Sequence, residues 1–415
     1  MIKKKILRFN TAGSVDDGKS TLIGRLLLDT NSIAVDQLKA IEIISKKNGY
    51  DFTDLSLITD GLKSEREQGI TIDVAYRYFE TQYRKFIIAD SPGHIQYTRN
   101  MVTAASTADL SVILIDATKG LLAQTKRHLF ISSLVNIKRI IVCINKMDLV
   151  DFEERNYLKI VNQCKKFCND LNFESIIFIP ISARNGDNIV SRSSNMKWFK
   201  KDPLIKNLNQ IKNNAQYNID FPRFSVQYVI RPRRKFFEEF RGFAGMVENG
   251  VFRKGDKVKI IPSQIGATID KIFYGEKEVK KAEIKMSVTV TLKNDIDISR
   301  GDWIVGEKNI PNLKSKFKSS IVWMSYDPLN TNDKLILKQK TKEVSAIVTS
   351  ILSKYNYDDF SKISKPETLE LNEIGIIEII TSEPIICDEI AQDSTNNMIL
   401  INPKNNETVG ACVIK

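Results

Sequence analysis

The sequence contains few of the residues that build disulfide frameworks and clustered metal sites. Among its 415 residues there are 5 cysteines and 2 histidines. The odd cysteine count and the scattered spacing exclude a disulfide-stapled secreted domain and indicate reduced thiols in a reducing compartment. Cys164 and Cys168 stand four residues apart on an expected helix, but no second ligand pair accompanies them, so we expect no metal site there.

Long hydrophobic runs are also missing. No uninterrupted apolar stretch approaches the roughly 20 residues that a membrane-spanning helix needs. Residues 1–8 form a basic cluster that no apolar stretch follows, which is not the pattern of a secretory signal peptide. These absences lead us to expect a cytoplasmic protein with no membrane partner.

The composition is that of a folded, globular protein. It has 42% hydrophobic, 27% charged and 8% aromatic residues, which excludes a disordered, collagen-like or coiled-coil chain. At about 100 to 200 residues per domain, the length predicts two to four domains. The formal net charge of +12 raises the question of nucleic-acid binding. Because the lysines are spread along the chain, we favour a general lysine enrichment and expect no nucleic-acid partner.

From residue 6 to about residue 183, within an expected first domain at residues 1–217, continuous apolar runs alternate with longer amphipathic segments. The runs Leu110–Ile115 and Ile140–Ile144 are rich in β-branched residues and do not alternate, as is typical of strands buried on both faces. Segments 124–134 and 153–171 show helical periodicity. The pattern predicts a doubly wound α/β domain.

The rest of the chain has the pattern of antiparallel β-structure. Its apolar runs are short, alternate with polar residues and are separated by Gly, Asn or Lys turns, as in Phe224–Val229, Val288–Leu292 and Lys342–Ile351. We predict two antiparallel β-barrel domains, at residues 218–312 and 313–415.

A phosphate-binding loop is the strongest chemical signal. Residues 13–20 read Gly-Ser-Val-Asp-Asp-Gly-Lys-Ser and match G-x-x-x-x-G-K-[ST], between an expected strand at 6–10 and an expected helix at 19–28. In such a loop backbone N–H groups cradle the phosphates, Lys19 reaches the β- and γ-phosphates, and the Ser20 hydroxyl binds Mg²⁺. We expect Lys19 to be catalytic and the nucleotide to be bound by Gly13, Ser14, Val15, Asp16, Asp17, Gly18, Lys19, Ser20 and Thr21.

A second motif identifies the base. Residues 145–148 follow an expected strand and match Asn-Lys-x-Asp, the guanine-reading signature of GTPases. The aspartate can accept hydrogen bonds from guanine N1–H and N2–H₂ together, whereas adenine has neither group in that arrangement. The asparagine supports the loop and the O6/N7 edge, the lysine stem covers the ring, and a Ser-Ala pair after the next strand would offer an N–H to O6. The expected guanine site comprises Asn145, Lys146, Asp148, Ser182 and Ala183.

Three residues around the expected strand at 86–89 are expected to sense the γ-phosphate or its Mg²⁺. Asp90 is placed to hold Mg²⁺ through water, and the Gly93 N–H to contact the γ-phosphate. Thr71 lies where a mobile first switch would offer an oxygen to the same Mg²⁺, so loss of the γ-phosphate should release both loops. The expected metal ligands are Ser20, Thr71 and Asp90.

The two histidines receive different interpretations. His94 follows Gly93 directly, and we assign it the catalytic role of orienting the attacking water, because phosphoryl transfer depends mainly on positioning and charge stabilisation. His128 lies in the helical run Lys-Arg-His-Leu, which we interpret as a solvated helix face.

These motifs identify the translation-factor superfamily of GTPases, and the three-domain layout resembles elongation factor Tu. Segments 14–27, 60–79, 86–101 and 295–302 resemble more narrowly the GTPase subunits of bacterial sulfate adenylyltransferases, and the resemblance spans nearly the whole chain. It implies that hydrolysis of GTP, with Mg²⁺, drives a partner catalytic subunit (subunit 2). That partner binds ATP and sulfate and makes adenylyl sulfate and pyrophosphate, in sulfate assimilation.

The sequence departs from the family at two places. Residues 90–94 read Asp-Ser-Pro-Gly-His where the family has Asp-Thr-Pro-Gly-His, and residues 231–240 read as a longer barrel turn than usual. No second phosphate loop, as in family members with a fused adenylyl-sulfate kinase, occurs in the sequence.

Two other functions are compatible with parts of the pattern. A translation-type GTPase that delivers a charged tRNA is favoured by the architecture and by the positive charge. A nucleotide-dependent scaffold without turnover would predict loss of the switch residues, yet Thr71, Asp90, Gly93 and His94 are all present.

Overall fold

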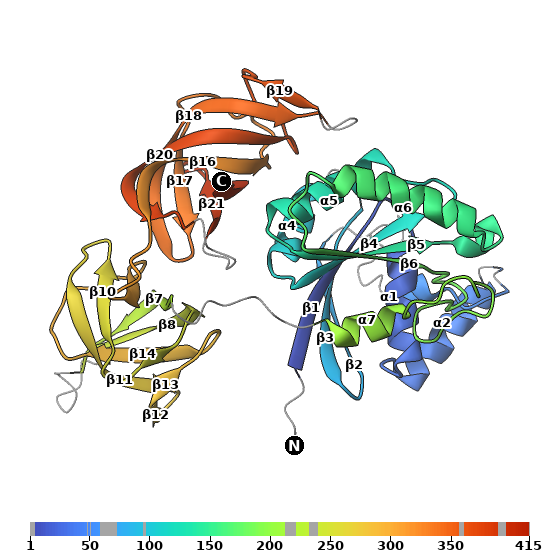
Figure 1. Ribbon diagram of the computed structural model, residues 1–415, viewed down its shortest axis with the longest axis horizontal. Coiled ribbons are helices and arrows are strands. Elements are labelled where there is room, and N and C mark those ends of the chain that lie inside the picture. The colour runs from blue at the N-terminus through green and yellow to red at the C-terminus, as the bar shows by residue number, and fades with distance from the viewer. Residues whose placement is uncertain are drawn as a thin grey trace. The chain divides into compact units, whose positions relative to one another are not determined.

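Figure 1 shows the computed structural model of the chain, which describes residues 5–47, 49, 51–58, 73–93, 97–211, 221–231, 240–356, 361–388 and 396–414. The chain divides into two compact units. One holds residues 1–213 with 357–359, and the other holds residues 214–356 with 360–415. None of the described helices is long and apolar enough to cross a membrane.

A six-stranded sheet forms the centre of the first unit. Its strands are β1 (Lys5–Ala12), β2 (Ala75–Glu80), β3 (Arg84–Asp90), β4 (Leu110–Asp116), β5 (Arg139–Asn145) and β6 (Ser175–Pro180). Their order is β2-β3-β1-β4-β5-β6, with β2 antiparallel to β3 and the other pairs parallel. Every residue of β4 is buried, and every residue of β5 after the first is buried. This burial on both faces of the sheet explains why the two strands have largely apolar sequences without alternation.

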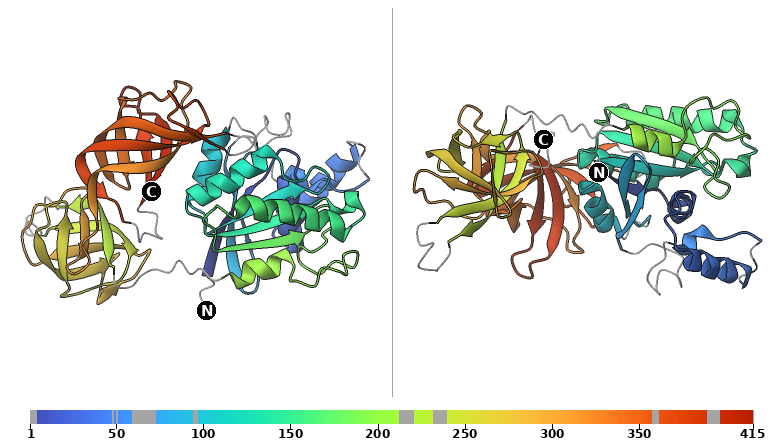
Figure 2. Two further views of the ribbon diagram at one scale, coloured as in Figure 1. Left: turned by 45° about the horizontal axis from the view of Figure 1, so that its top comes forward. Right: turned by 90° about the horizontal axis from the view of Figure 1, so that it is seen from below.

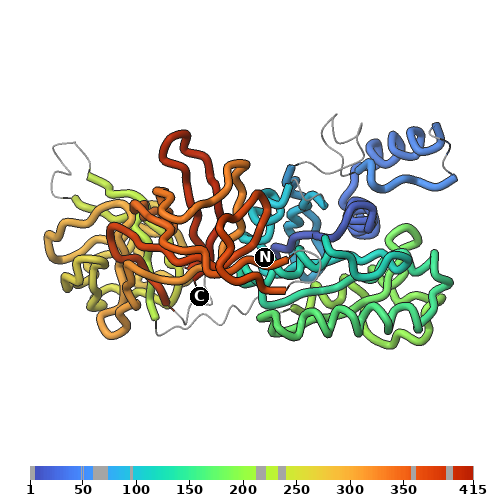
Figure 3. The backbone as a smooth tube through the Cα atoms, turned by 90° about the horizontal axis from the view of Figure 1, so that it is seen from above, coloured from blue at the N-terminus to red at the C-terminus, as the bar shows by residue number. Residues whose placement is uncertain are grey.

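Helices cover both faces of this sheet (Figure 1). Helix α2 is an exception, because it lies away from the sheet, as Figures 2 and 3 show from other directions. The described helices are α1 (Lys19–Asp29), α2 (Val35–Lys47), α4 (Thr98–Ser106), α5 (Ala123–Leu134), α6 (Glu154–Cys168) and α7 (Leu204–Gln210), with 3₁₀ turns η1 (Leu55–Ile58) and η3 (Met147–Val150). The carboxyl ends of the parallel strands and the loops that follow them form one edge of the sheet, where α/β domains bind ligands.

The second unit begins with a closed antiparallel barrel. Its strands are β7 (Arg223–Ile230), β8 (Gly242–Asn249), β10 (Lys257–Ile261), β11 (Gly266–Tyr274), β14 (Ser287–Leu292) and β15 (Trp303–Gly306). They follow the order β10-β15-β7-β8-β14-β11, and the pairing of β10 with β11 closes the ring. Short strands β9 (Phe252–Arg253), β12 (Lys277–Val279) and β13 (Lys281–Ala282) lie outside it. The alternating inward residues, such as Phe224, Val258 and Ile304, form its core.

A second barrel follows. Its strands are β16 (Leu313–Trp323), β17 (Lys334–Gln339), β18 (Lys342–Tyr355), β20 (Ile374–Ile386), β21 (Asn397–Ile401) and β22 (Thr408–Ile414), with β19 (Lys362–Ser364) at the end of β18. The order is β17-β21-β22-β16-β20-β18, closed by β17 with β18. The predicted fold class, an α/β domain followed by two antiparallel barrels, is therefore confirmed. The domain limits at residues 217 and 312 stay predictions.

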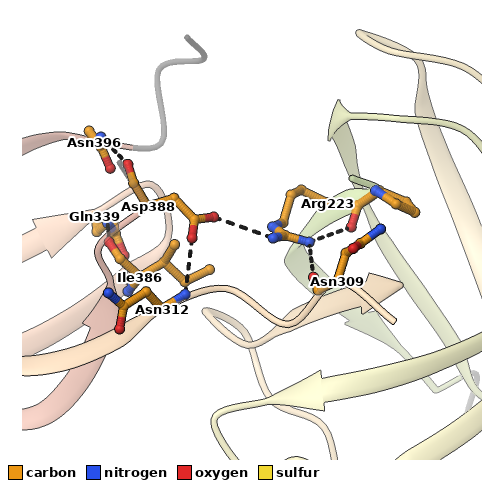
Figure 4. A network of polar contacts seen from close by, with 8 residues as sticks. Arg223, Asn309, Asn312, Gln339, Ile386, Asp388 and Asn396 are labelled. Atoms are coloured by element: carbon orange, nitrogen blue, oxygen red, sulfur yellow. Dashed lines mark hydrogen bonds and ion pairs between the residues drawn. The ribbon is translucent and has the colours of Figure 1, made fainter. Parts of the chain in front are cut away.

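The two barrels share a buried junction (Figure 4). Arg223 of β7 lies 3.3 Å from the carboxylate of Asp388 and donates to the Asn309 carbonyl at 2.7 Å, while Asp388 accepts the Asn312 N–H at 3.0 Å. An apolar cluster from both barrels lies with this network and contains Ile261, Trp303, Val305, Ile386 and Leu313.

Candidate nucleotide-binding site

The phosphate loop runs from the end of β1 to the start of α1. Gly18 precedes the helix with a φ of +92°, a left-handed conformation that favours glycine. A Cβ at this position would stand 2.4 Å from Nδ2 of Asn145. The second glycine of the motif is therefore required both by the backbone turn and by the close approach of the Asn145 side chain.

Lys19 is buried against its own loop. Its ammonium group donates to the Gly13 carbonyl at 3.0 Å and to the Ser14 carbonyl at 2.8 Å. A Cβ at Gly93 would lie 2.5 Å from Nζ, so the segment after β3 approaches the same ammonium group. Burial lowers the pKa of Lys19, and the negative charges of Asp17, Asp90 and Asp16 partly offset this effect.

Asp17 is a buried carboxylate within the loop. Its Oδ2 accepts the Ser14 N–H at 2.7 Å, whereas Oδ1 has no hydrogen-bond partner among the described residues. Burial raises the pKa of Asp17 to about 6, although the charge of Lys19 and the Ser14 hydrogen bond act in the opposite direction. The motif pattern places Asp17 at a variable position, so it gave no signal for this environment.

Asn145 joins three segments of the site. Its Nδ2 donates to the Asp17 carbonyl at 2.8 Å, and its Oδ1 accepts the Ala183 N–H at 2.9 Å. The side chain therefore connects the phosphate loop, the end of β5 and the turn after β6. Ser182 in that turn is buried, and its hydroxyl accepts the Asn185 N–H at 3.3 Å.

Asp148 and Lys146 differ in their contacts. Asp148 lies in η3, partly buried, and pairs with no other described residue. Lys146 instead forms an ion pair of 2.9 Å with Asp116 at the end of β4.

Asp116 is a residue that the sequence interpretation missed. Burial would raise its pKa, but hydrogen bonds from Lys146 and Thr118 hold the pKa below the ordinary value. The sequence did contain a signal for this residue. Asp116 ends a buried strand, and the Asn-Lys-x-Asp motif follows the next strand, so the two lie close together if these strands are neighbours. In the sheet register Asp116 is paired with Asn145.

Asp90 and its neighbour Ser91 are tied to β1. The Thr11 hydroxyl donates to Asp90 Oδ1 at 2.9 Å, and the Ser91 hydroxyl donates to the Thr11 carbonyl. Asp90 is 1% exposed, at the edge of the sheet where the phosphate loop begins. Thr71 and His94 lie outside the described residues, so the structure gives no position for these two predicted residues.

The interpretation of His128 as a solvated residue is wrong. The side chain is 2% exposed, and its Nδ1 accepts the Gly13 N–H at 3.0 Å. The polar run around it suggested a solvent-facing surface, but α5 buries Thr125, His128 and Leu129 together because they share the face that packs on the sheet and the loop. Burial lowers the pKa of His128 to about 3, with contributions from the charges of Lys19 and Arg127.

The structure thus brings most of the predicted site residues to one edge of the sheet. Contacts among side chains and backbone join the phosphate loop, Gly93, the base motif and the turn after β6. Val15, Asp16, Ser20 and Thr21 lie in or directly after the loop by position. The individual roles assigned to these residues stay predictions.

Two family models match the chain. Residues 4–262 match the Elongation factor Tu GTP binding domain, and residues 316–415 match the GTP-eEF1A C-terminal domain-like family. Two solved structures titled as sup35 also match. The one complexed with GDP is 20% identical over 100% of this chain and 94% of the solved chain, with a TM-score of 0.45. The one complexed with GMPPNP is 19% identical over 99% of this chain and 94% of the solved chain, with the same TM-score of 0.45.

Curated relatives align along nearly the whole chain. A protein of Alteromonas mediterranea named Sulfate adenylyltransferase subunit 1 is 48% identical over 99% of this chain and 87% of its own length. A protein of Francisella tularensis subsp. novicida with the same name is 48% identical, with the same coverage. A protein of Rhizobium sp. named Bifunctional enzyme NodQ is 45% identical over 99% of this chain and 64% of its own length.

Proposed function

The chain belongs to the sulfate adenylyltransferase subunit 1 family, as its motifs predicted, and we propose that its hydrolysis of GTP drives a partner catalytic subunit that makes adenylyl sulfate and pyrophosphate from ATP and sulfate. As a family member it is a GTP-hydrolysing subunit of an enzyme complex. The observation that carries the proposal is the 48% identity along the whole chain, barrels included, rather than in the GTPase domain alone.

Guanine is the base that the site geometry favours. Asn145 holds the base motif against the phosphate loop, and Asp148 has a carboxylate with no other described partner. A carboxylate in this position can accept both N1–H and N2–H₂ of guanine, and the stem of Lys146, whose ammonium group pairs with Asp116 at 2.9 Å, is proposed to cover the ring. The Ala183 N–H, proposed as a donor to guanine O6, donates to Asn145 Oδ1 at 2.9 Å in this structure, so binding of the base would require it to change partner.

The residues near the phosphate loop fit a magnesium ion. Ser20 would supply a hydroxyl oxygen and Asp90 a buried carboxylate already oriented by the Thr11 hydroxyl, and oxygen donors of these kinds are the ones that Mg²⁺ prefers. Thr71 is the proposed third ligand. Bound Mg²⁺ would neutralise part of the charge on the β- and γ-phosphates.

The chain's own residues would supply positioning and charge for hydrolysis. Lys19 would move its donors from the loop carbonyls to the β- and γ-phosphate oxygens, where negative charge is concentrated. Gly93, which leaves space for Lys19, would donate its N–H to the γ-phosphate. His94 is proposed to orient the attacking water, and Thr71 to report the presence of the γ-phosphate.

The proposed partner is the catalytic subunit that binds ATP and sulfate, and the proposed compartment is the cytoplasm. All five cysteines are free and buried, as expected for a protein of a reducing compartment. No nucleic-acid or membrane partner is proposed.

A reconstituted assay separates this function from its rivals. The full chain is mixed with the catalytic subunit, ATP, sulfate and GTP, and adenylyl sulfate is measured against a parallel mixture with the Lys19→Ala variant. We expect GTP-dependent release of adenylyl sulfate from the first mixture only. GTP-dependent binding of a charged tRNA without that product would support the translation-type GTPase, and GTP binding without any turnover would support a scaffold.

A further inference from the structure

Helix α5 contacts the phosphate loop through two side chains. The imidazole Nδ1 of His128 lies 3.0 Å from the backbone nitrogen of Gly13, and the hydroxyls of Thr125 and Ser14 lie 3.1 Å apart. All four residues are buried. The loop is therefore held from a helix that contributes no residue to the recognised motifs.

The contact fixes the protonation of the imidazole. A backbone N–H can only donate, so Nδ1 must be the accepting nitrogen of a neutral ring and the proton must be on Nε2. Nε2 of the ring lies 3.1 Å from Nε2 of Gln124, one turn earlier on α5, and because Oε1 of that amide accepts from Arg127 at 3.1 Å, Gln124 offers no acceptor for the ring proton. Burial and the nearby charges of Lys19 and Arg127 lower the pKa of His128 to about 3, which keeps the ring in this neutral form at physiological pH.

Gly13 is also linked to Lys19. The residue is held through its N–H by His128 and through its carbonyl by the Lys19 ammonium group at 3.0 Å. A Cβ at Gly13 would lie 2.8 Å from the Leu114 carbonyl, so β4 closes the other side and leaves little room for a substitute partner. Without the imidazole, the buried N–H would lose its acceptor and the start of the loop would lose one of its two anchors.

We propose that His128 is a positioning residue of the phosphate loop, whose neutral imidazole fixes Gly13 in the conformation that binds the phosphates of GTP. The inference rests on the proposed nucleotide site. It concerns the affinity for the nucleotide, because His128 contacts the loop and not the reacting atoms.

The test compares substitutions that differ in where they place an acceptor. In His128→Asn, Oδ1 can occupy the position of Nδ1, whereas in His128→Gln the amide is one carbon farther away, and His128→Leu has no acceptor. The dissociation constant of a fluorescent, non-hydrolysable GTP analogue is measured with each full-length variant, together with its melting temperature. Ser132→Ala is the matched control, because Ser132 lies on the same helix and its buried hydroxyl is 3.2 Å from that of Ser111, away from the loop.

We expect His128→Leu and His128→Gln to bind the analogue about 10-fold or more weakly, as for an unpaired buried donor, and His128→Asn to stay within about 3-fold of the parent. Ser132→Ala should bind like the parent. If His128→Leu does not fold, the proposal is tested by comparing the dissociation constants of His128→Asn and His128→Gln. Equal affinities for these two variants would overturn the proposal, as would parental binding by His128→Leu. The Lys19→Ala variant tests the proposed nucleotide site separately. If this variant bound the analogue as tightly as the parent, the nucleotide site itself would be assigned wrongly.

Discussion

Three buried carboxylates lie around the nucleotide site, and their partners differ. Asp90 accepts from Thr11, and Asp116 accepts from Thr118 and Lys146. Asp17 has only the Ser14 N–H, and its second oxygen has no partner among the described residues. A buried charge with incomplete hydrogen bonding is costly, so Asp17 is the residue whose ionisation should affect stability most visibly.

The pH dependence of unfolding should reveal Asp17. Burial raises the pKa of Asp17 from its ordinary value of 3.8 to about 6, so the folded chain binds more protons than the unfolded chain between these pH values. Stability should therefore fall as pH rises from about 4 to 6 and then level off, by up to about 3 kcal/mol. Asp17→Asn should lose this part of the slope in urea unfolding without nucleotide, while Asp16→Asn, which changes the exposed neighbour, should keep it. The same slope in the parent and in Asp17→Asn would contradict the prediction.

Asp148 is the residue proposed to select the base. Asp148→Asn replaces the acceptor for guanine N1–H and N2–H₂ with an amide, which leaves donors facing donors. We expect GTP binding to weaken by roughly 2 to 5 kcal/mol, and xanthosine triphosphate to bind better than GTP. Titration calorimetry with both nucleotides checks this, with Asp151→Asn, an exposed residue just after η3, as the control. Unchanged GTP affinity would remove Asp148 from the base site.

The elements differ in how well their sequences predict them. β4 and β5 were predicted because burial on both faces requires continuous apolar runs. β2 was not, because Tyr76 and Tyr78 are exposed on this edge strand and the run lacks an apolar pattern. Each barrel is closed by one strand pair, β10 with β11 in the first and β17 with β18 in the second. This pairing depends on the arrangement of all the strands of the barrel, so the sequence of either strand alone does not predict it.

The site follows the same rule. The phosphate loop and the base motif were recognisable because each needs fixed residue types at fixed spacing next to a strand. The contacts of Asp116, Asp17 and His128 were missed, since they depend on which strands and helices become neighbours in the fold. The assignments for Thr71 and His94 stay predictions.

The junction of the two barrels depends on a buried ion pair. Arg223→Met would leave Asp388 without its cation and the Asn309 carbonyl without its donor. We expect a loss of roughly 2 to 4 kcal/mol in urea unfolding of the full chain, lower than for a fully buried pair because Asp388 is 21% exposed. Arg241→Met is the control, because the partners of Arg241, Asp295 and Asp297, are almost fully exposed. We expect this variant to change the free energy of unfolding by no more than about 1 kcal/mol. Equal losses in the two variants would show that the Arg223 pair has no special role.

The whole molecule combines a GTPase unit with a unit of two barrels, and the curated relatives match across both. Forming a mixed anhydride of sulfate and phosphate at the expense of the α–β bond of ATP is uphill, so a catalytic subunit alone should stall as pyrophosphate accumulates. Hydrolysis of GTP can move that equilibrium only if its steps are coupled to the adenylyl transfer, because sites that do not influence each other exchange no free energy.

The central claim is that GTP hydrolysis drives the synthesis of adenylyl sulfate, and the final level of product in the reconstituted complex tests it most directly. The chain, the catalytic subunit, ATP, sulfate and added pyrophosphate are incubated to a constant product level, once with GTP and once with a non-hydrolysable GTP analogue. We predict a higher level of adenylyl sulfate with GTP, together with GTP hydrolysis that the catalytic subunit and its substrates accelerate. Equal final levels with GTP and with the analogue would contradict the claim, and would leave the chain as a switch that does not drive the reaction.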